Sequence, residues 1–125
     1  MPFLWFSKND QKITTTLNHN HLTLNSPAVN IFESIDRVRL GCDPEKRLAV
    51  IELLDLDAVQ SYRFKDDELI SISTQSSYVR INCTAFVDLL IELMPELALK
   101  VFPLKFETTY DNVKKMFYID FNKEV

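Results

Sequence analysis

Two histidines, His19 and His21, have a spacing that could support metal chemistry. They form an H-x-H pair in the stretch LNHNHL, and alternate positions on a strand share a face, so their two imidazoles could hold a metal ion. The sequence contains no third histidine. A structural zinc site would therefore need both cysteines, Cys42 and Cys83, as its remaining ligands. We expect a polar hairpin turn here instead, with no metal and no cofactor.

The other reactive residue types lack the surroundings that catalysis requires. The cysteines form no C-x-x-C pair and nothing around Cys83 resembles a catalytic signature, so both are expected to be reduced, buried thiols of a cytoplasmic protein. The carboxylates Asp55, Asp57 and 66–68 fall in an acidic link between patterned segments. With Gly41 as the single glycine, the usual glycine-rich phosphate loops cannot form. We therefore expect a protein that is not an enzyme.

Composition predicts one domain, 1–125, with an uneven charge distribution. The chain carries 14 basic and 18 acidic residues, whereas a broad nucleic-acid-binding face usually brings an excess of Lys and Arg. Six basic and five acidic residues occur up to Arg47, and two basic and six acidic residues occur over 52–68. A locally basic patch is compatible with this distribution. The opening MPFLWFSKND is too short in its apolar run for a signal peptide or a membrane span, so we expect an edge strand or a plug into the core.

Hydrophobic spacing predicts the elements of the first half. The stretch ITTTLNHNHLTLN, residues 13–25, alternates on both sides of an Asn-rich turn and predicts a hairpin. Ser26 and Pro27 form a helix start, with a hydroxyl N-cap followed by proline. Residues 37–53 predict a second hairpin that turns at 43–46.

The pattern then restarts after a link, 54–68, which contains a candidate short strand at 61–64. Residues 69–82 predict another hairpin, and Thr84 is placed to cap a strongly apolar helix in which Pro95 introduces a kink or a second short piece. A last hairpin turns near 111–112.

The two halves align without a gap at an offset of 57, which predicts an internal duplication of 12–53 as 69–121. Two generic hairpin–helix units could match by pattern alone, but the shared junction of strand, Asn, cap and helix favours a true repeat. One such unit is too small for a good core, so two should pack about a pseudo-two-fold axis. We therefore predict an α+β fold, a mostly antiparallel barrel-like sheet from two pseudo-two-fold-related ββαββ units. The matched pairs are Ile13 and Ile70, Leu22 and Val79, Leu24 and Ile81, Asn25 and Asn82, and Ala28 and Ala85.

This unit resembles the SpoVT/AbrB-like swapped-hairpin barrel family. The family's signature is similar to G-R-[IV]-T-[IL]-P-x-x-[LV] entering a helix, and NHLTLNSPAV and SYVRINCTAF occupy that place here. Asn20 and Ser77 replace the glycine, His21 and Tyr78 the arginine, and Asn25 and Asn82 the proline. Family members are typically homodimers of short chains, whereas this chain would form the whole barrel alone.

The resemblance implies a small DNA-binding transcriptional regulator or an antitoxin-like protein that binds double-stranded DNA. Because few of the positions carried over from the family hold a clear cation, binding should be weak with a shallow salt dependence. The contact residues expected from the resemblance and from local basic charge are Lys12, His21, Arg37, Arg39, Lys46, Arg47 and Arg80.

The alternative is a protein–protein interaction or assembly module of unknown function, with a mobile element as its suggested origin. The helix that follows Cys83 is apolar over most of its circumference, so it is either buried on several sides or meets a protein partner or a second copy in a homodimer. The interface residues of this alternative are Phe86, Val87, Leu90, Ile91 and Met94.

Overall fold

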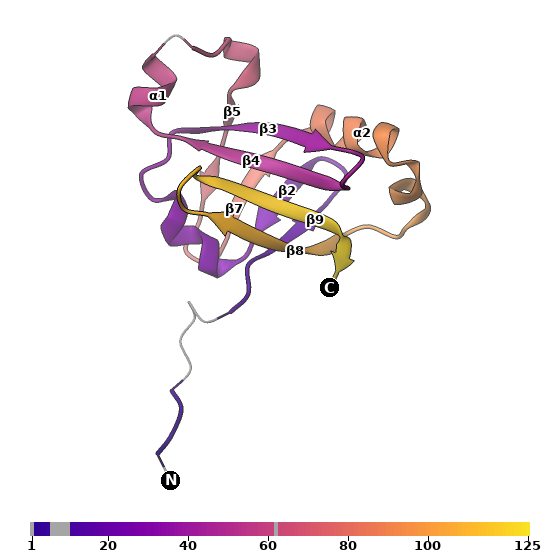
Figure 1. The fold of residues 1–125 in the computed structure, drawn as a ribbon, viewed down its shortest axis with the longest axis horizontal. Helices are drawn as coiled ribbons and strands as arrows, with labels where there is room; N and C mark the ends of the chain where they lie inside the picture. Colours follow the sequence, from indigo (N-terminus) through magenta and orange to yellow (C-terminus); the bar gives the residue numbers. More distant parts are fainter. Residues whose placement is uncertain (1, 6–10, 62) are drawn as a thin grey trace.

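The computed structural model describes residues 2–5, 11–61 and 63–125, and its strands form a nearly closed antiparallel barrel-like sheet (Figure 1). The barrel predicted from the hydrophobic patterning is therefore confirmed. The strands are β1 Thr14–Leu17, β2 His21–Leu24, β3 Arg37–Asp43, β4 Leu48–Leu54, β5 Ile70–Ser71, β6 Ser73–Thr74, β7 Val79–Asn82, β8 Leu104–Asp111 and β9 Met116–Glu124. The helices are α1 Leu56–Gln60 and α2 Thr84–Leu93, with 3-10 helices η2 Ser26–Phe32, η3 Asp66–Glu68 and η4 Pro95–Leu99.

The sheet closes through one short segment of chain. The strand order is β5-β3-β4-β9-β8-β1-β2-β7-β6, so β5 and β6 stand at opposite ends of the sheet although only Ile72 separates them in sequence. β5 pairs with β3, and β6 pairs with β7. Residues 70–74 therefore bring the two ends of the sheet together.

The two halves of the chain interleave around the barrel. In the first half, the hairpin β1–β2 makes no ladder with the hairpin β3–β4; each pairs with strands of the second half instead. β1 pairs with β8, β2 with β7, β4 with β9 and β3 with β5. The sheet therefore forms only when both halves are present.

Alternating side chains of every long strand fill one core. Phe117 stacks on Phe32 of η2 with ring centroids 5.3 Å apart, and its ring lies 4.7 Å from that of Tyr110. The Thr15 and Thr108 hydroxyls, both buried, satisfy one another at 2.7 Å. The fully buried strand residues include Leu17, Leu22, Leu24, Val38, Ala49, Ile51, Val79, Ile81, Phe106, Phe117 and Ile119.

The helical segments differ in part from the prediction. The segment that begins at Ser26 is a 3-10 helix, and the link contains the helix α1, whose N-cap Asp55 accepts a hydrogen bond from the Ala58 amide at 2.8 Å. The candidate strand at 61–64 is wrong for the described residues of that stretch; Tyr62 lies outside them. Pro95 does start a second helical piece, η4.

The start of the chain is exposed. Pro2–Trp5 forms neither a strand nor a plug, so that prediction is wrong for these residues, and residues 6–10 lie outside the described part. Across the described ranges, no helix has both the length and the apolar character needed to cross a bilayer.

Candidate nucleic-acid interface

A polar surface covers the outside of β1, β2 and β7 and includes Ser73 of β6, which is opposite Arg80. On these strands every second side chain is buried, so the residues between them face outward. We call this surface the polar face, and its residues are Thr14, Thr16, His21, Thr23, Ser73, Arg80 and Asn82.

Arg80 lies in the middle of the polar face. It is directly opposite Thr23 on β2 and Ser73 on β6, and its Nε donates to the Asn82 Oδ1 at 2.9 Å. Among the described residues, no carboxylate lies within ion-pair distance of its guanidinium. The positive charge of Arg80 is therefore available to an anionic ligand.

Among the described residues, the β8 edge of the polar face adds one free cation and one ion pair. Lys105 is opposite Thr16, and Glu107, opposite Thr14, is neutralised by Lys12 at 3.4 Å. Sequence reasoning missed Lys105, because its place beside the polar face depends on the pairing of β1 with β8.

His21 contributes hydrogen bonds rather than charge. Its Nδ1 donates to the Asn20 Oδ1 at 2.7 Å, and its Nε2 accepts from the Asn18 side-chain amide at 3.1 Å. Burial, and then the nearby Arg80 charge, lower the pKa of His21 from its ordinary 6.5. His21 is therefore neutral near pH 7 and cannot neutralise a phosphate.

The lowered pKa of His21 predicts an acid-sensitive stability. Below pH 6.5 the unfolded chain binds a proton that the folded protein still excludes, so the free energy of unfolding should fall as the pH decreases toward the folded pKa. Urea unfolding at about pH 7.5 and about pH 5.5 measures the loss. A His21→Asn variant should lose less stability over the same interval, since the carboxylates titrate in both proteins. An unchanged pH dependence in the variant would contradict this role.

The rings of the two histidines have separate partners. The His19 ring stacks on Phe102, 4.3 Å between centroids and 8° from parallel, and both ring nitrogens of His21 are engaged by asparagine side chains. Within the described ranges, no three His, Cys, Asp or Glu side chains are grouped so that they could hold a metal ion.

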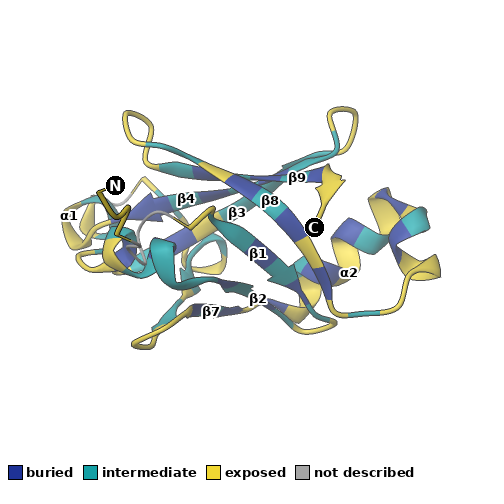
Figure 2. Ribbon diagram, turned by 90° about the horizontal axis from the view of Figure 1, so that it is seen from below, coloured by how far each residue is buried: buried dark blue, intermediate teal, exposed yellow. Residues whose placement is uncertain are grey.

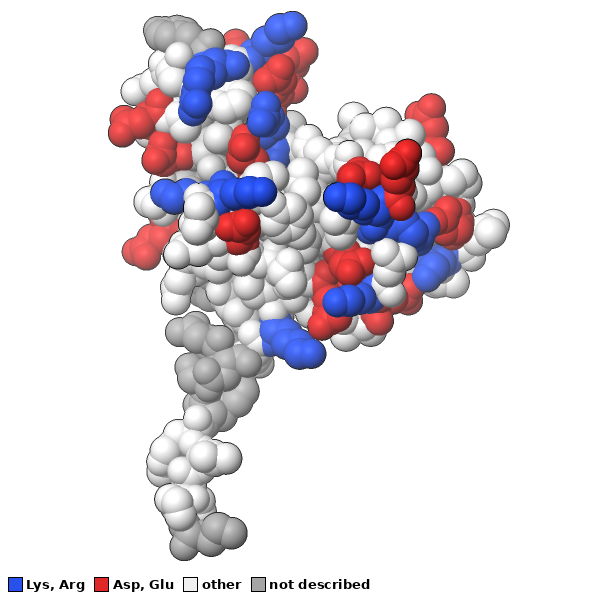
Figure 3. Space-filling model, in the orientation of Figure 1, with Lys and Arg blue, Asp and Glu red and all other residues white. Residues whose placement is uncertain are grey.

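The four remaining predicted contact residues lie on the β3–β4 hairpin, away from β2. Arg39 pairs with Glu52 at 3.0 Å, Arg37 with Asp36 at 3.8 Å, and Arg47 with Glu96. The Lys46 side chain has no carboxylate partner among the described residues. On the side of the molecule seen in Figure 3, basic and acidic side chains lie next to one another in two groups. The structure therefore brings Lys12, His21 and Arg80 to or beside the polar face and leaves the hairpin cations largely neutralised.

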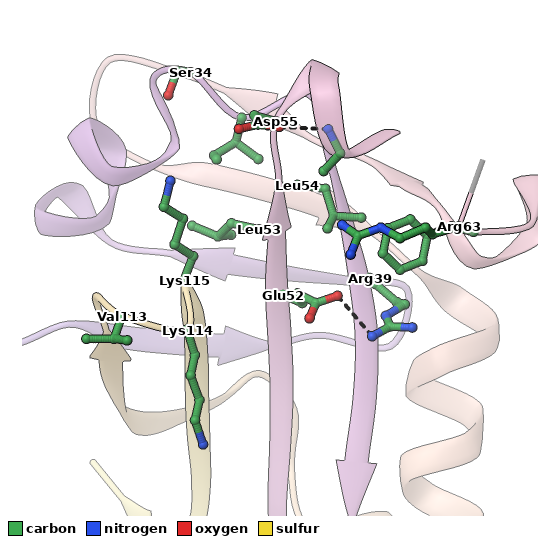
Figure 4. A pocket seen from close by; sticks show the side chains of 13 residues that line it. Ser34, Arg39, Glu52, Leu53, Leu54, Asp55, Arg63, Val113, Lys114 and Lys115 are labelled. Atoms are coloured by element: carbon green, nitrogen blue, oxygen red, sulfur yellow. Dashed lines mark hydrogen bonds and ion pairs between the residues drawn. The ribbon is translucent and has the colours of Figure 1, made fainter. Parts of the chain in front are cut away.

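A cavity of about 410 Å³ lies beside the end of β4, α1 and the β8–β9 turn (Figure 4). The guanidinium of Arg39 lies 4.9 Å from the centroid of Phe64, and that of Arg63 lies 5.5 Å from it. Lys114 and Lys115 extend in opposite directions, so the cations do not converge on one point. Neither histidine nor cysteine is among the described residues that line this cavity.

The cysteines are free, and Cys83 is the more protected. It is buried at the N-cap of α2, and burial raises the pKa of its thiol to about 11; burial, and then Asp43, also raise the pKa of the half-buried Cys42. We expect Ellman's reagent to modify Cys83 only after unfolding. A Cys42→Ser variant should show almost no reaction when native and one thiol in denaturant. A rapid native reaction of that variant would contradict the assignment.

The α2 helix buries only one of its apolar sides. Val87, Leu90 and Met94 pack inside the core and are not available to a partner, and Phe86 and Ile91 are half-buried against it. The exposed large apolar residues of the helix are Leu89 and Leu93, each 42% exposed.

Comparison with family models, curated proteins and solved structures finds no match to this chain.

Proposed function

We propose that this protein is a non-enzymatic nucleic-acid-binding module made of two fused swapped-hairpin half-barrels, and that it contacts the backbone of duplex DNA through the polar face. The observation that carries the proposal is the position of Arg80, unpaired with any described carboxylate, at the centre of a surface of hydroxyl and amide side chains. Arg, Ser, Thr and Asn are donors that proteins use on phosphate oxygens.

The register of β2 and β7 supports the duplication. Arg80 follows its partner Thr23 by 57 positions, the offset at which the two halves align. Under the same offset, the pair Leu22–Ile81 exchanges with the pair Leu24–Val79. A two-fold axis between Thr23 and Arg80 would produce this pattern.

The second hairpin of each half, β3–β4 in the first and β8–β9 in the second, also supports the duplication, but at an offset of 68 positions. Tyr118 pairs with Val50, 68 positions earlier. Two backbone hydrogen bonds are related by the same offset. The Leu53 amide donates to the Lys115 carbonyl and the Phe121 amide donates to the Arg47 carbonyl, both at 2.9 Å. Arg47 has φ 56° and Lys115 φ 55°. The larger offset matches the longer helical segment of the second half, α2 and η4 in place of η2.

The outer surfaces of the hairpins β3–β4 and β8–β9 also resemble one another. Two shallow hollows, of about 270 and 330 Å³, lie on either side of Val50 and Tyr118. When 68 is added to the number of a residue that lines one hollow, the result is in five cases a residue that lines one of the two hollows. The corresponding pairs are Arg39 and Glu107, Gly41 and Thr109, Leu48 and Met116, Val50 and Tyr118, and Glu52 and Asp120.

The charge of the polar face predicts weak binding. Lys12 is paired with Glu107, so Arg80 and Lys105 can neutralise about two phosphates. The logarithm of the binding constant should therefore fall with the logarithm of salt concentration at a slope of about −2. Affinity without sequence preference is then expected at roughly 10⁻⁴ to 10⁻⁶ M. Fluorescence anisotropy with a labelled mixed-sequence duplex, titrated at several low salt concentrations, measures both quantities.

The Arg80→Ala variant tests the surface. It should weaken binding and reduce the salt slope by about 1, because one phosphate contact is lost. Lys46→Ala is the matched control, since it removes one cation from the β3–β4 turn and should leave the slope unchanged. The proposal fails if the wild-type protein does not bind at low salt, or if both variants weaken binding equally.

A further inference from the structure

The barrel is completed within one chain, yet two apolar surfaces stay outside it. The first is the N-terminal arm, Pro2–Trp5, which exposes Phe3 by 79%, Leu4 by 99% and Trp5 by 85%. The Phe3 and Trp5 rings contact each other at 5.9 Å between centroids. An extended segment with three large exposed apolar side chains is typical of a docking peptide rather than of a solvated terminus.

The second surface lies on α2 and the segment that follows it, at one end of the molecule (Figure 2). Leu89 and Leu93 are one helical turn apart, so they share the outward side of α2. Leu99 and Val101, exposed by 87% and 89%, follow them in the chain. We call these four residues the α2 patch.

We propose that two copies of this protein form a symmetric dimer by exchanging arms, the arm of each copy lying on the α2 patch of the other. Such an exchange is isologous, because the same two surfaces of each copy are used. The arm carries no acidic residue, so the exposed carboxylates Asp88 and Glu92 beside the patch do not repel it.

The area available matches what a stable dimer needs. Each aromatic side chain buries roughly 150–250 Å² when it is fully covered, so the four aromatic side chains of two arms contribute roughly 600–1,000 Å². The surfaces that they cover contribute about as much again. The total falls in the range of roughly 1,200–2,000 Å² that specific interfaces bury. One arm alone on its own patch would bury half of this area and would produce no dimer.

Trp5 makes the proposal directly measurable, because it is the only tryptophan in the chain. Trp5 emission should shift to shorter wavelength as protein concentration rises, with the same midpoint as the monomer-to-dimer transition seen by sedimentation equilibrium. A wild-type chain that stays monomeric to several hundred micromolar overturns the proposal. A blue-shifted emission that does not change with concentration also overturns it, since the arm would then lie on its own chain.

Substitutions identify the two surfaces. A variant lacking residues 2–5 and the double variant Leu89→Lys with Leu93→Lys should each remain monomeric with unchanged circular dichroism, because the altered side chains are exposed or half-exposed. Val113→Lys is the control: it charges an exposed apolar residue, 92% exposed, in the β8–β9 turn and should leave dimerisation intact. Dimerisation that persists in either test variant overturns the proposal.

Mixing the two monomeric variants tests the exchange itself. The arm-deleted chain keeps its patch and the patch variant keeps its arm, so one of the two contacts can re-form. The mixture should show a mixed dimer, weaker than the wild-type dimer and accompanied by a blue shift of Trp5. Absence of any association in the mixture, while the wild type dimerises, would contradict the pairing of arm with patch. The Arg80→Ala variant should dimerise normally, so failure of the DNA proposal and failure of this one are distinguishable.

Discussion

Replacing Phe117 with alanine should lower the free energy of unfolding by about 3–5 kcal/mol. Phe117 is fully buried in β9, stacks on Phe32 of η2 and contacts Tyr110 of β8. Its ring therefore packs between η2, from the first half of the chain, and the β8–β9 hairpin of the second half. Because alanine leaves a cavity between elements held in place by the surrounding sheet, the loss should lie near the upper end for a core residue.

Urea denaturation followed by circular dichroism measures this loss. The same truncation at Phe3, which is 79% exposed, is the matched control and should change stability by less than about 0.5 kcal/mol when the protein is dilute. A loss below about 1 kcal/mol for Phe117→Ala would show that its ring does not hold the two halves together.

Replacing Leu90 with alanine should cost about 2–5 kcal/mol, whereas the same change at Leu89 should cost less than about 1 kcal/mol. The two leucines are adjacent in α2, but Leu90 is completely buried and Leu89 is 42% exposed. Helix propensity is the same for both substitutions, so the difference between them reports burial alone. The comparison also establishes which side of α2 remains for a partner.

The same unfolding experiment checks both leucine variants. Equal losses at the two positions would mean that α2 is buried on both sides in solution, and the α2 patch would then not exist. A larger loss at Leu89 than at Leu90 would require the helix to be rotated about its axis.

Local patterning predicted the hairpins well. Thr14–Leu17 and His21–Leu24 lie where alternation and the Asn-rich turn indicated, and the turn at 43–46 is present. These features depend on side chains that are close in sequence, because strand alternation and turn chemistry are local properties. The helix α1 was missed, since its five residues are too few to show a helical period.

Charge pairing could not be predicted in the same way. Arg39 and Glu52 are ordinary surface residues in the sequence, and they meet only because β3 pairs with β4 in one register. Arg47 meets Glu96 because η4 lies beside the β3–β4 turn. Seven contact residues were predicted from the sequence, and among the described residues the structure leaves only the group around Arg80 as a candidate contact surface. Lys105 joins this group from β8, a strand far away in sequence.

The sequence by itself determined the hairpins, the single core and the presence of a strongly apolar helix, because periods of two and of about 3.6 residues act over a few positions. Only the tertiary structure decided which hairpin pairs with which, how residues 70–74 close the sheet, which side of α2 is buried and which cations stay unpaired. Most of these depend on contacts between residues far apart in the chain, such as Thr23 with Arg80 and Val50 with Tyr118, or on the exclusion of water from one side of an element. Such contacts leave no periodic trace in the chain, since any apolar strand can pair with any other until the whole barrel selects one arrangement.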